Sequence, residues 1–287
     1  MEKYVTDIVR REKNTRIALS KQFPVLLPTI LESKRFLIFL RYTLGFKFRI
    51  RKSDTSKWFN LVEHSSSLYR KYNKKILDEG KINNIQIAIK KIDGLIIPPG
   101  HIFSFWKFVG RTSKRKGFKN GLVLANGSLE ENIGGGLCQL SNLIAYMFGC
   151  TECSFVERKH HSKDVFPDSN RTVPFASGAT VFFNLIDLKI KNTYPFPIKI
   201  NLRTTDTQLR GSVSAPNQLN YFIKLKEENP QFIKSVRTGI LYRCNEIYRI
   251  FYSKNTKQKI KEHLLWKNIA EVMYGENEIK GPVSTFE

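Results

Sequence analysis

The sequence predicts an α+β fold with a helical basic N-terminal region, a central mixed domain and a C-terminal β-hairpin. Apolar residues at three-to-four spacing indicate helices, and clustered β-branched and aromatic runs indicate strands. The strands follow one another rather than alternating with helices, which favours antiparallel pairing. We expect residues 1–81 to form the helical region, 82–215 the core domain and 216–287 a β-rich extension.

The N-terminal region carries most of the positive charge. Residues 1–120 hold 27 Lys and Arg against 9 Asp and Glu, so +18 of the net +23 falls there. Residues 29–52 mix basic and aromatic side chains, which predicts a basic amphipathic helix on an anionic membrane surface. The alternative is a helix that packs its apolar side on the core. A nucleic-acid partner is disfavoured, because the basic residues form no known nucleic-acid-binding motif.

The chain start predicts no signal peptide, since a charged segment followed by an apolar one is missing. Its most apolar stretch, residues 36–40, is far shorter than the roughly 20 residues that cross a bilayer. Four cysteines in 287 residues do not make a disulfide scaffold. We therefore expect a cytoplasmic protein with free thiols, peripheral at the inner membrane face and without a transmembrane helix.

Residues 58–79 are predicted to be helical, like the residues before them. The alternating isoleucines of residues 82–89 fit a strand or a short helix. A helix is predicted over residues 138–148, where apolar residues recur at helical spacing. Three neighbouring strands are predicted to form a meander. They are residues 179–191, 198–203 and 208–215. A hairpin is predicted in the tail, with strands 246–253 and 259–266.

The residue favoured to carry chemistry is Cys138, which follows the glycines Gly134, Gly135 and Gly136 and begins the predicted helix. A helix N-terminus carries partial positive charge and unpaired amides, which favour a thiolate. The glycines permit positive φ and close approach of a substrate, and their amides could hold an oxyanion. The alternative is a buried, inert cysteine at a helix start.

A nucleophilic cysteine needs a base, and the adjacent His160 and His161 are the candidates. A zinc site is the rival interpretation, because Cys150 and Cys153 have the two-residue spacing of zinc ligands. His160 or His161 could complete the set with Cys138, but a structural zinc site usually shows a second ligand pair of its own, and the C-x-x-C pair here is single. We therefore expect no metal and no cofactor.

Residues 82–215 resemble the VanW domain. The resemblance rests on several linked motifs in order. They are Pro98-Pro99-Gly100, Phe103-Ser104-Phe105, Gly110, Ile133-Gly134-Gly135-Gly136-Leu137-Cys138-Gln139-Leu140-Ser141, Val156-Glu157-Arg158, Ser177-Gly178-Ala179-Thr180-Val181 and Asp187. The similarity extends into both flanks.

The resemblance implies a role in the bacterial cell wall and in glycopeptide resistance. Some members are thought to be L,D-transpeptidases that cross-link stem peptides through a cysteine acyl-enzyme. On that pattern Cys138 is the nucleophile, and Gln139 and Ser141 join the three glycines as substrate- or oxyanion-binding residues. The supporting residues would be Glu157, Arg158 and Asp187.

Two positions depart from the family pattern. One is in the histidine motif Glu-Arg-His-x-His-Ser, and the other is a position where many members have an aspartate. Lys159 replaces the first histidine, and Gly178 stands where many members have aspartate. The base therefore moves to His160 or His161. Two functions remain open: a cysteine acyl transferase on stem peptides or their lipid-linked precursors, and a non-catalytic accessory protein that binds wall precursors at the membrane surface.

Overall fold

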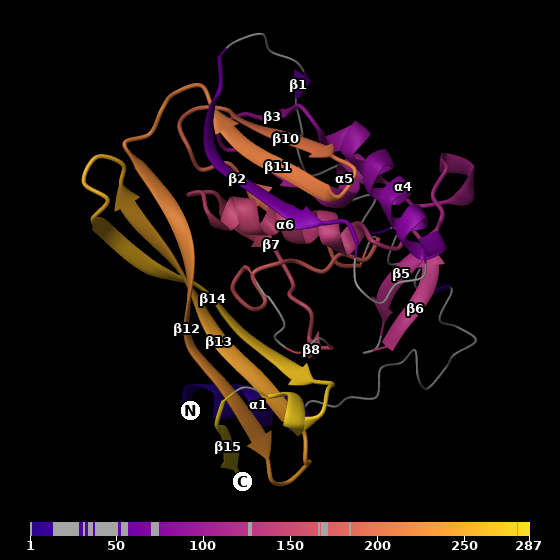
Figure 1. Ribbon diagram of the computed structural model, residues 1–287, viewed down its shortest axis with the longest axis vertical. Coiled ribbons are helices and arrows are strands. Elements are labelled where there is room, and N and C mark those ends of the chain that lie inside the picture. The colour runs from indigo at the N-terminus through magenta and orange to yellow at the C-terminus, as the bar shows by residue number, and fades with distance from the viewer. Residues whose placement is uncertain are drawn as a thin grey trace.

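The computed structural model describes residues 2–13, 29–30, 32–33, 37, 51–52, 57–69, 75–125, 128–165, 167, 172–183, 185–279 and 281–287. It has two parts (Figure 1). A body of sheet and helices lies at the top, and a long twisted sheet descends from it toward both chain ends. Helices combine with several antiparallel sheets, so the predicted α+β class is confirmed in outline.

The body is built on a five-stranded antiparallel sheet in the order β1-β3-β10-β11-β2. The bounds are β1 Arg51–Lys52, β2 Phe59–Ser67, β3 Leu95–Ile97, β10 Ile198–Thr204 and β11 Gln208–Ala215. Residues of β10 alternate between buried and less buried, the period of a strand with one face on a core. Its buried residues Ile198, Ile200 and Leu202 belong to the core that the helices complete.

Helices α4 (Lys75–Ile92) and α6 (Leu137–Gly149) pack against this sheet, and the short α5 (Phe105–Val109) packs on α4. On α6 the buried residues recur at three-to-four spacing, which confirms the helix predicted over residues 138–148. None of the helices in the described part of the chain is both long and apolar enough to cross a bilayer.

The long sheet has the order β15-β12-β13-β14-β8. The bounds are β8 Lys163–Asp164, β12 Tyr221–Ser235, β13 Leu241–Ser253, β14 Lys259–Val272 and β15 Val283–Phe286. Strands β13 and β14 pair antiparallel, so the predicted tail hairpin is confirmed, although it is longer and β12 adds a strand to it. Strands β8 and β15 join parallel to their neighbours.

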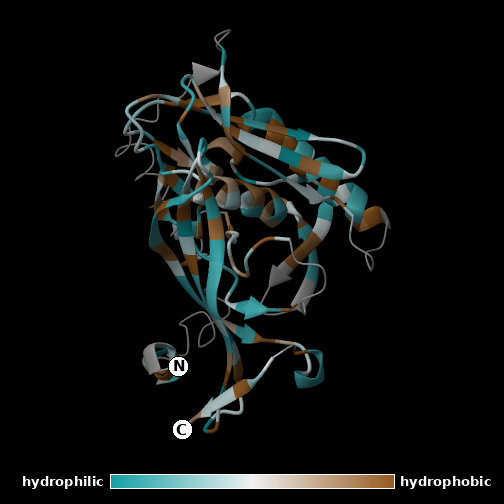
Figure 2. Cartoon of the chain, turned by 60° about the vertical axis from the view of Figure 1, so that its left-hand side comes forward, coloured by the Kyte–Doolittle hydropathy of each residue, from teal (hydrophilic) through white to brown (hydrophobic). Residues whose placement is uncertain are grey.

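Helix α1 (Glu2–Lys13) packs on the far end of the long sheet, near both termini (Figure 2). Its Tyr4 and Ile8 are buried in a second small core with residues of β12 and β13. Glu12 accepts hydrogen bonds from the Arg237 guanidinium at 2.6 Å and the Thr238 hydroxyl at 2.8 Å. The first residues of the chain are therefore anchored to its last strands.

Two small sheets accompany the body. One is β4-β9-β7 and the other is the β5-β6 hairpin. The bounds are β4 Ile102–Ser104, β7 Ser154–Glu157, β9 Lys189–Lys191, β5 Asn120–Ala125 and β6 Ser128–Ile133, with short 3-10 turns at Lys114–Lys116 and Glu276–Glu278. The β5-β6 hairpin leads directly into the glycine loop before α6.

The helix expected over residues 58–79 is corrected. Within residues 58–79, expected to be helical, Phe59–Ser67 is strand β2, because its side chains alternate in exposure and it pairs with β11 along its length. The described part of helix α4 begins at Lys75 and runs past residue 81 to Ile92. The amphipathic helix expected over residues 29–52 lies largely outside the described residues.

The three-stranded meander is also corrected. Of the strand expected over residues 179–191, only β9 forms, and it pairs with β4 and β7 rather than with β10. The stretch before β9 is irregular because side chains of α6 occupy its backbone groups. The Ala179 amide donates to Asn142 Oδ1 at 2.8 Å, and its carbonyl accepts from the Ser141 hydroxyl at 2.6 Å.

Candidate functional site

Cys138 is the second residue of α6, and Gly136, with φ of +94°, caps the start of this helix. The glycine-loop-to-helix position predicted for the cysteine is therefore confirmed. Its side chain is half-buried, whereas the other three cysteines are buried. The Cys138 sulfur lies 4.0 Å from the Thr180 hydroxyl and 3.9 Å from the Val181 carbonyl oxygen. The thiol thus faces residues 180–181.

The glycine amides do not have the role expected of them. The amides of Gly134, Gly135 and Gly136 donate to the carbonyls of Lys119, Asn132 and Leu122 at 3.0 to 3.1 Å. An amide engaged in a backbone hydrogen bond cannot also hold an oxyanion without losing that bond. The loop is tied to the β5-β6 hairpin instead.

The glycines are required by close packing. A Cβ at Gly135 would lie 2.1 Å from the backbone of Gly121, and a Cβ at Gly136 would lie 2.2 Å from Cγ of Lys81. Positive φ at Gly136 adds a second requirement. The expected close backbone approach is therefore present, but it is made by strand β5 of the same chain.

The segment from Glu157 to His161 runs beside the stretch that faces the thiol. The Thr180 amide donates to the Lys159 carbonyl at 2.8 Å, and these two residues form an antiparallel bridge. Directly opposed residues in such a bridge have their side chains on the same face. Lys159, the position of the missing family histidine, is therefore on the face of Thr180, whose hydroxyl lies beside the Cys138 sulfur.

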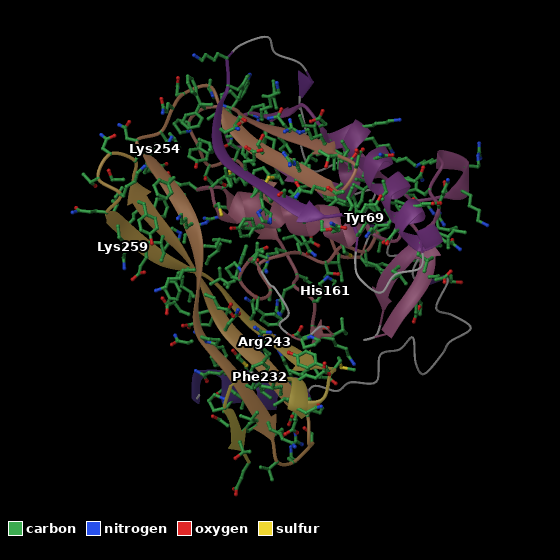
Figure 3. The ribbon with its side chains drawn as sticks, in the orientation of Figure 1. Tyr69, His161, Phe232, Arg243, Lys254 and Lys259 are labelled. Carbon is green, nitrogen blue, oxygen red and sulfur yellow. The ribbon has the colours of Figure 1, made fainter. Side chains whose placement is uncertain are left out.

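Arg158 and His160 project to the opposite side, toward the long sheet. The Arg158 guanidinium stacks on Trp266 at 3.6 Å and donates to the carbonyls of Gly178 and Ala176. The His160 Nε2 donates to the Ile269 carbonyl at 3.0 Å. Because side chains alternate along an extended segment, His161 shares the side of Lys159. Figure 3 shows His161 in the region between the body and the long sheet.

His160 is unsuited to act as the base. Burial, and then the nearby cations Arg158 and Arg11, lower its pKa to about 4, although the hydrogen bond to Ile269 opposes this shift. The ring is therefore neutral at pH 7, with its Nε2 proton committed to a carbonyl. Of the two predicted histidines, only His161 remains a candidate base.

The low pKa of His160 makes stability depend on pH. Below pH 6.5 the unfolded chain binds a proton that the folded protein does not bind until about pH 4, so stability falls as pH drops through this window. At pH 5 the loss is about 2 kcal/mol. We expect His160→Gln, which can keep a donor toward Ile269, to remove this loss when urea unfolding at pH 7.5 and 5.0 is compared. An equal pH 5 loss in both proteins would contradict the assignment.

Gln139 and Ser141 are anchored within the fold. The side-chain amide of Gln139 donates to the Ser66 hydroxyl at 3.0 Å and to the Ser67 carbonyl at 2.7 Å, which joins α6 to β2. Ser141 is fully buried and bonds the Ala179 carbonyl. Both residues position the start of α6 against its neighbours.

Glu157 and Asp187 form a polar junction around α5. The buried Asp187 carboxylate accepts from the Ser104 hydroxyl at 2.6 Å and from the amides of Trp106 and Leu188. Glu157 accepts from the Asp187 amide at 2.8 Å and pairs with Lys189 at 2.6 Å. These contacts hold β4, β7 and β9 together, so both supporting residues predicted from the sequence have structural partners.

At Gly178, the other departure from the family pattern, a side chain would collide with Asn142. A Cβ there would lie 2.2 Å from the Asn142 Oδ1 atom. That oxygen accepts the Ala179 amide, so Asn142 is part of the frame that holds residues 179–181 beside the thiol.

The remaining cysteines provide no metal site. Among the described residues no group of three or more His, Cys, Asp or Glu side chains is placed to hold a metal ion. Burial raises the pKa of Cys150 and Cys153 to about 11 and that of Cys244 to about 12. These three thiols are protonated and inaccessible in the folded protein.

This difference predicts selective labelling. We expect iodoacetamide at pH 8 to modify Cys138 in the native protein and all four cysteines after denaturation, since alkylation requires an accessible thiolate. Peptide mapping by mass spectrometry locates the label. Labelling of Cys150, Cys153 or Cys244 at the rate of Cys138 would contradict the burial described above.

Thr180 is the site residue that sequence reasoning did not single out. It lay in the expected strand, and only its bridge to Lys159 brings its hydroxyl to the thiol. The one available signal was its place in the motif Ser177-Gly178-Ala179-Thr180-Val181.

Comparison with known proteins adds the following. Residues 80–214 match the family described as VanW like protein. The chain is 29% identical over 263 residues to Vancomycin B-type resistance protein VanW of Enterococcus faecalis, covering 90% of this chain and 94% of that protein. It is 30% identical over 126 residues to Uncharacterized protein YoaR of Bacillus subtilis, covering 44% of this chain and 40% of that protein. No solved structure matches.

Proposed function

Because residues 80–214 match the family described as VanW like protein, we propose that this chain belongs to that family and takes part in glycopeptide resistance as a cysteine-dependent acyl transferase of the cell wall. Its substrate would be a peptidoglycan stem peptide or the lipid-linked precursor. The proposal is carried by one observation: the half-buried Cys138 sulfur, in the first turn of α6, lies 4.0 Å from the hydroxyl of Thr180, the residue that bridges Lys159. The name of the Enterococcus relative supports the link to vancomycin resistance.

In the proposed reaction the Cys138 thiolate attacks a carbonyl of the donor stem. The peptide C–N bond breaks, a thioester forms, and the departing amine takes a proton from the base. The amine of a second stem then attacks the thioester, and the sulfur leaves as thiolate. The base accepts the proton of the attacking amine, so both half-reactions balance without a further reactant.

His161 is the proposed base. Alternation along the extended segment puts it on the same side as Lys159, the bridge partner of Thr180, whereas His160 faces Ile269. Lys159 would supply positive charge that favours the thiolate, a role that needs no proton transfer. His161 would transfer the proton and Lys159 would stabilise the thiolate, two tasks that a single histidine of the family pattern would perform.

The oxyanion would be held at the start of α6 rather than in the glycine loop. The backbone amides of Gly134, Gly135 and Gly136 already donate to backbone carbonyls, and the backbone amide of Gln139 donates to the Gly136 carbonyl. A helix leaves its first amides without intrahelical acceptors, so the backbone amide of Leu137 is the proposed donor. The partial positive charge of the helix start acts in the same direction.

Covalent capture tests the proposal. The purified protein is incubated with a synthetic tetrapeptide stem, quenched in acid and measured by intact-mass spectrometry. We expect a mass increase equal to the acyl part of the stem, mapped to the peptide containing Cys138. Binding of the stem without any adduct, measured by calorimetry, would instead support the non-catalytic accessory role. In that role, residues 29–52 would hold the protein at an anionic membrane surface next to lipid-linked precursors.

A further inference from the structure

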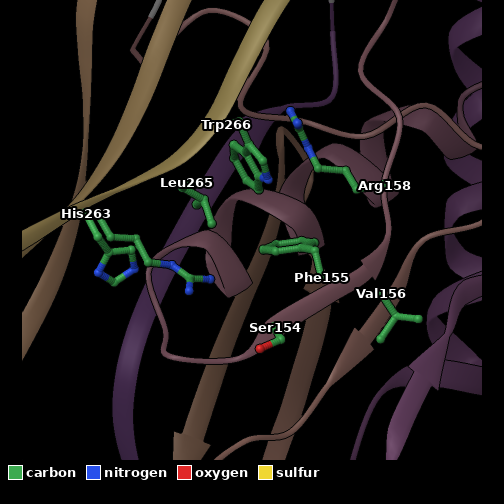
Figure 4. A pocket seen from close by; sticks show the side chains of 8 residues that line it. Ser154, Phe155, Val156, Arg158, His263, Leu265 and Trp266 are labelled. Carbon is green, nitrogen blue, oxygen red and sulfur yellow. The ribbon is translucent and has the colours of Figure 1, made fainter.

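A pocket of about 480 Å³ lies where strand β7 meets β13 and β14 of the long sheet. Figure 4 shows its walls. They are Ser154, Phe155, Val156, Arg158, Arg249, His263, Leu265 and Trp266. Two of these eight residues are arginines and none is acidic. The pocket is on the side of the Glu157–His161 segment to which Arg158 projects, opposite to Lys159, so it is separate from the thiol site.

The hydrogen bonds of both arginines all go to backbone carbonyl oxygens. Arg249 donates to the carbonyls of Gly149, Phe148 and Cys153 at 2.7 to 3.2 Å. Arg158 donates to Gly178 and Ala176 and stacks on Trp266. In the described part of the chain, neither guanidinium forms an ion pair with a carboxylate. Carbonyl oxygens satisfy N–H donors but do not neutralise a charge. The carboxylate of Glu152 acts on Arg249 electrostatically without forming an ion pair with it, and a buried charge without a paired counter-ion is costly.

The guanidinium groups keep donors for a ligand. The hydrogen bonds of Arg158 and Arg249 use their Nε and Nη2 atoms, and a guanidinium has five N–H donors. Their Nη1 atoms have no hydrogen-bond partner among the described residues, and each keeps a small exposed area although Arg249 as a whole is only 5% exposed. Planar guanidinium donors held in place match carboxylate and phosphate oxygens well.

The rest of the wall is apolar and aromatic. Phe155 and Trp266 pack edge to face at 5.0 Å, with Leu265 and Val156 beside them. A binding pocket typically combines such walls with a few convergent polar groups. We propose that this pocket binds an anionic group, a carboxylate or phosphate, carried on an apolar or aromatic segment.

Nuclear magnetic resonance of the intact protein tests the proposal through Trp266. The chain has three tryptophans, so the Trp266 indole N–H signal is assigned by its loss in Trp266→Phe. Three probes are titrated: N-acetylphenylalanine, its uncharged amide, and phenyl phosphate. We expect saturable shifts with at least one of the two anions and not with the amide, and their relative affinities decide between carboxylate and phosphate. Equal shifts with the acid and its amide, or no shift with either anion, would overturn the proposal.

A charge placed in the pocket gives an independent test that does not remove an arginine. His263 is exposed and lies directly opposite Arg249 across β13 and β14. We expect His263→Glu to supply the missing carboxylate, to weaken binding of the preferred anion at least tenfold, and to raise the melting temperature. The matched control is Leu264→Glu, one residue along β14 and not in the pocket wall, which should leave the affinity unchanged. Unchanged affinity in His263→Glu would contradict the site.

Discussion

Cys138→Ala is expected to abolish the acyl adduct and to lower the rate of stem-peptide transfer roughly 10³-fold or more, as loss of a covalent nucleophile does. The fold should survive the change, because Cys138 is only partly buried and its sulfur contacts Thr180 and Val181 at 4.0 and 3.9 Å rather than more closely. The measurement is the transfer product formed from donor and acceptor stems, separated by chromatography and identified by mass. Thermal unfolding of the same preparation shows whether the variant is folded.

Cys244→Ala is the matched control for this prediction. It removes a thiol that is buried in β13, in the long sheet rather than at the start of α6. We expect this variant to lose some stability but to keep the transfer rate of the parent protein. If Cys138→Ala retained more than a tenth of the rate while folded, the cysteine would not be the nucleophile, and the accessory role would be favoured.

The sequence predicted the local elements best where one periodicity prevailed. The helix that begins at the cysteine and the β13-β14 hairpin follow from apolar spacing and clustered β-branched residues. Strand β2 was misread because its apolar residues continue from a basic region that resembles a helix, and only pairing with β11 fixes it as a strand. The local spacing of residues does not predict which distant strand will pair with a given segment.

The site was predicted in part for the same reason. Cys138 stands at the helix start as its glycines implied, but the acceptors of the glycine amides come from β5, β6 and Lys119, the residue before β5. The Lys159-Thr180 bridge, which decides which of the neighbouring residues faces the thiol, joins positions that the sequence did not connect. The pocket combines Arg158 with Arg249, about ninety residues later, so no local motif could indicate it.

The glycine loop leads to the second large effect. We expect Gly135→Ala to destabilise the protein by about 3 kcal/mol or more. The new methyl group would meet backbone atoms, which cannot move aside as a flexible side chain can. The new methyl group would lie 2.1 Å from the backbone carbonyl of Gly121. The buried Asn84 donates to the carbonyls of both Gly135 and Lys119 at 2.9 Å, so a shift of the loop would also break this clasp.

Gly100→Ala separates this clash from backbone strain. Gly100 has φ of +72° but nothing within 4 Å of a Cβ, so its substitution should cost only about 1–2 kcal/mol. Gly135 has no positive φ, and its cost comes from the collision alone. Urea unfolding of both variants measures the difference. If Gly135→Ala were as stable as Gly100→Ala, the loop would be loosely packed, and its glycines would be better explained by contact with a substrate than by contact with strand β5.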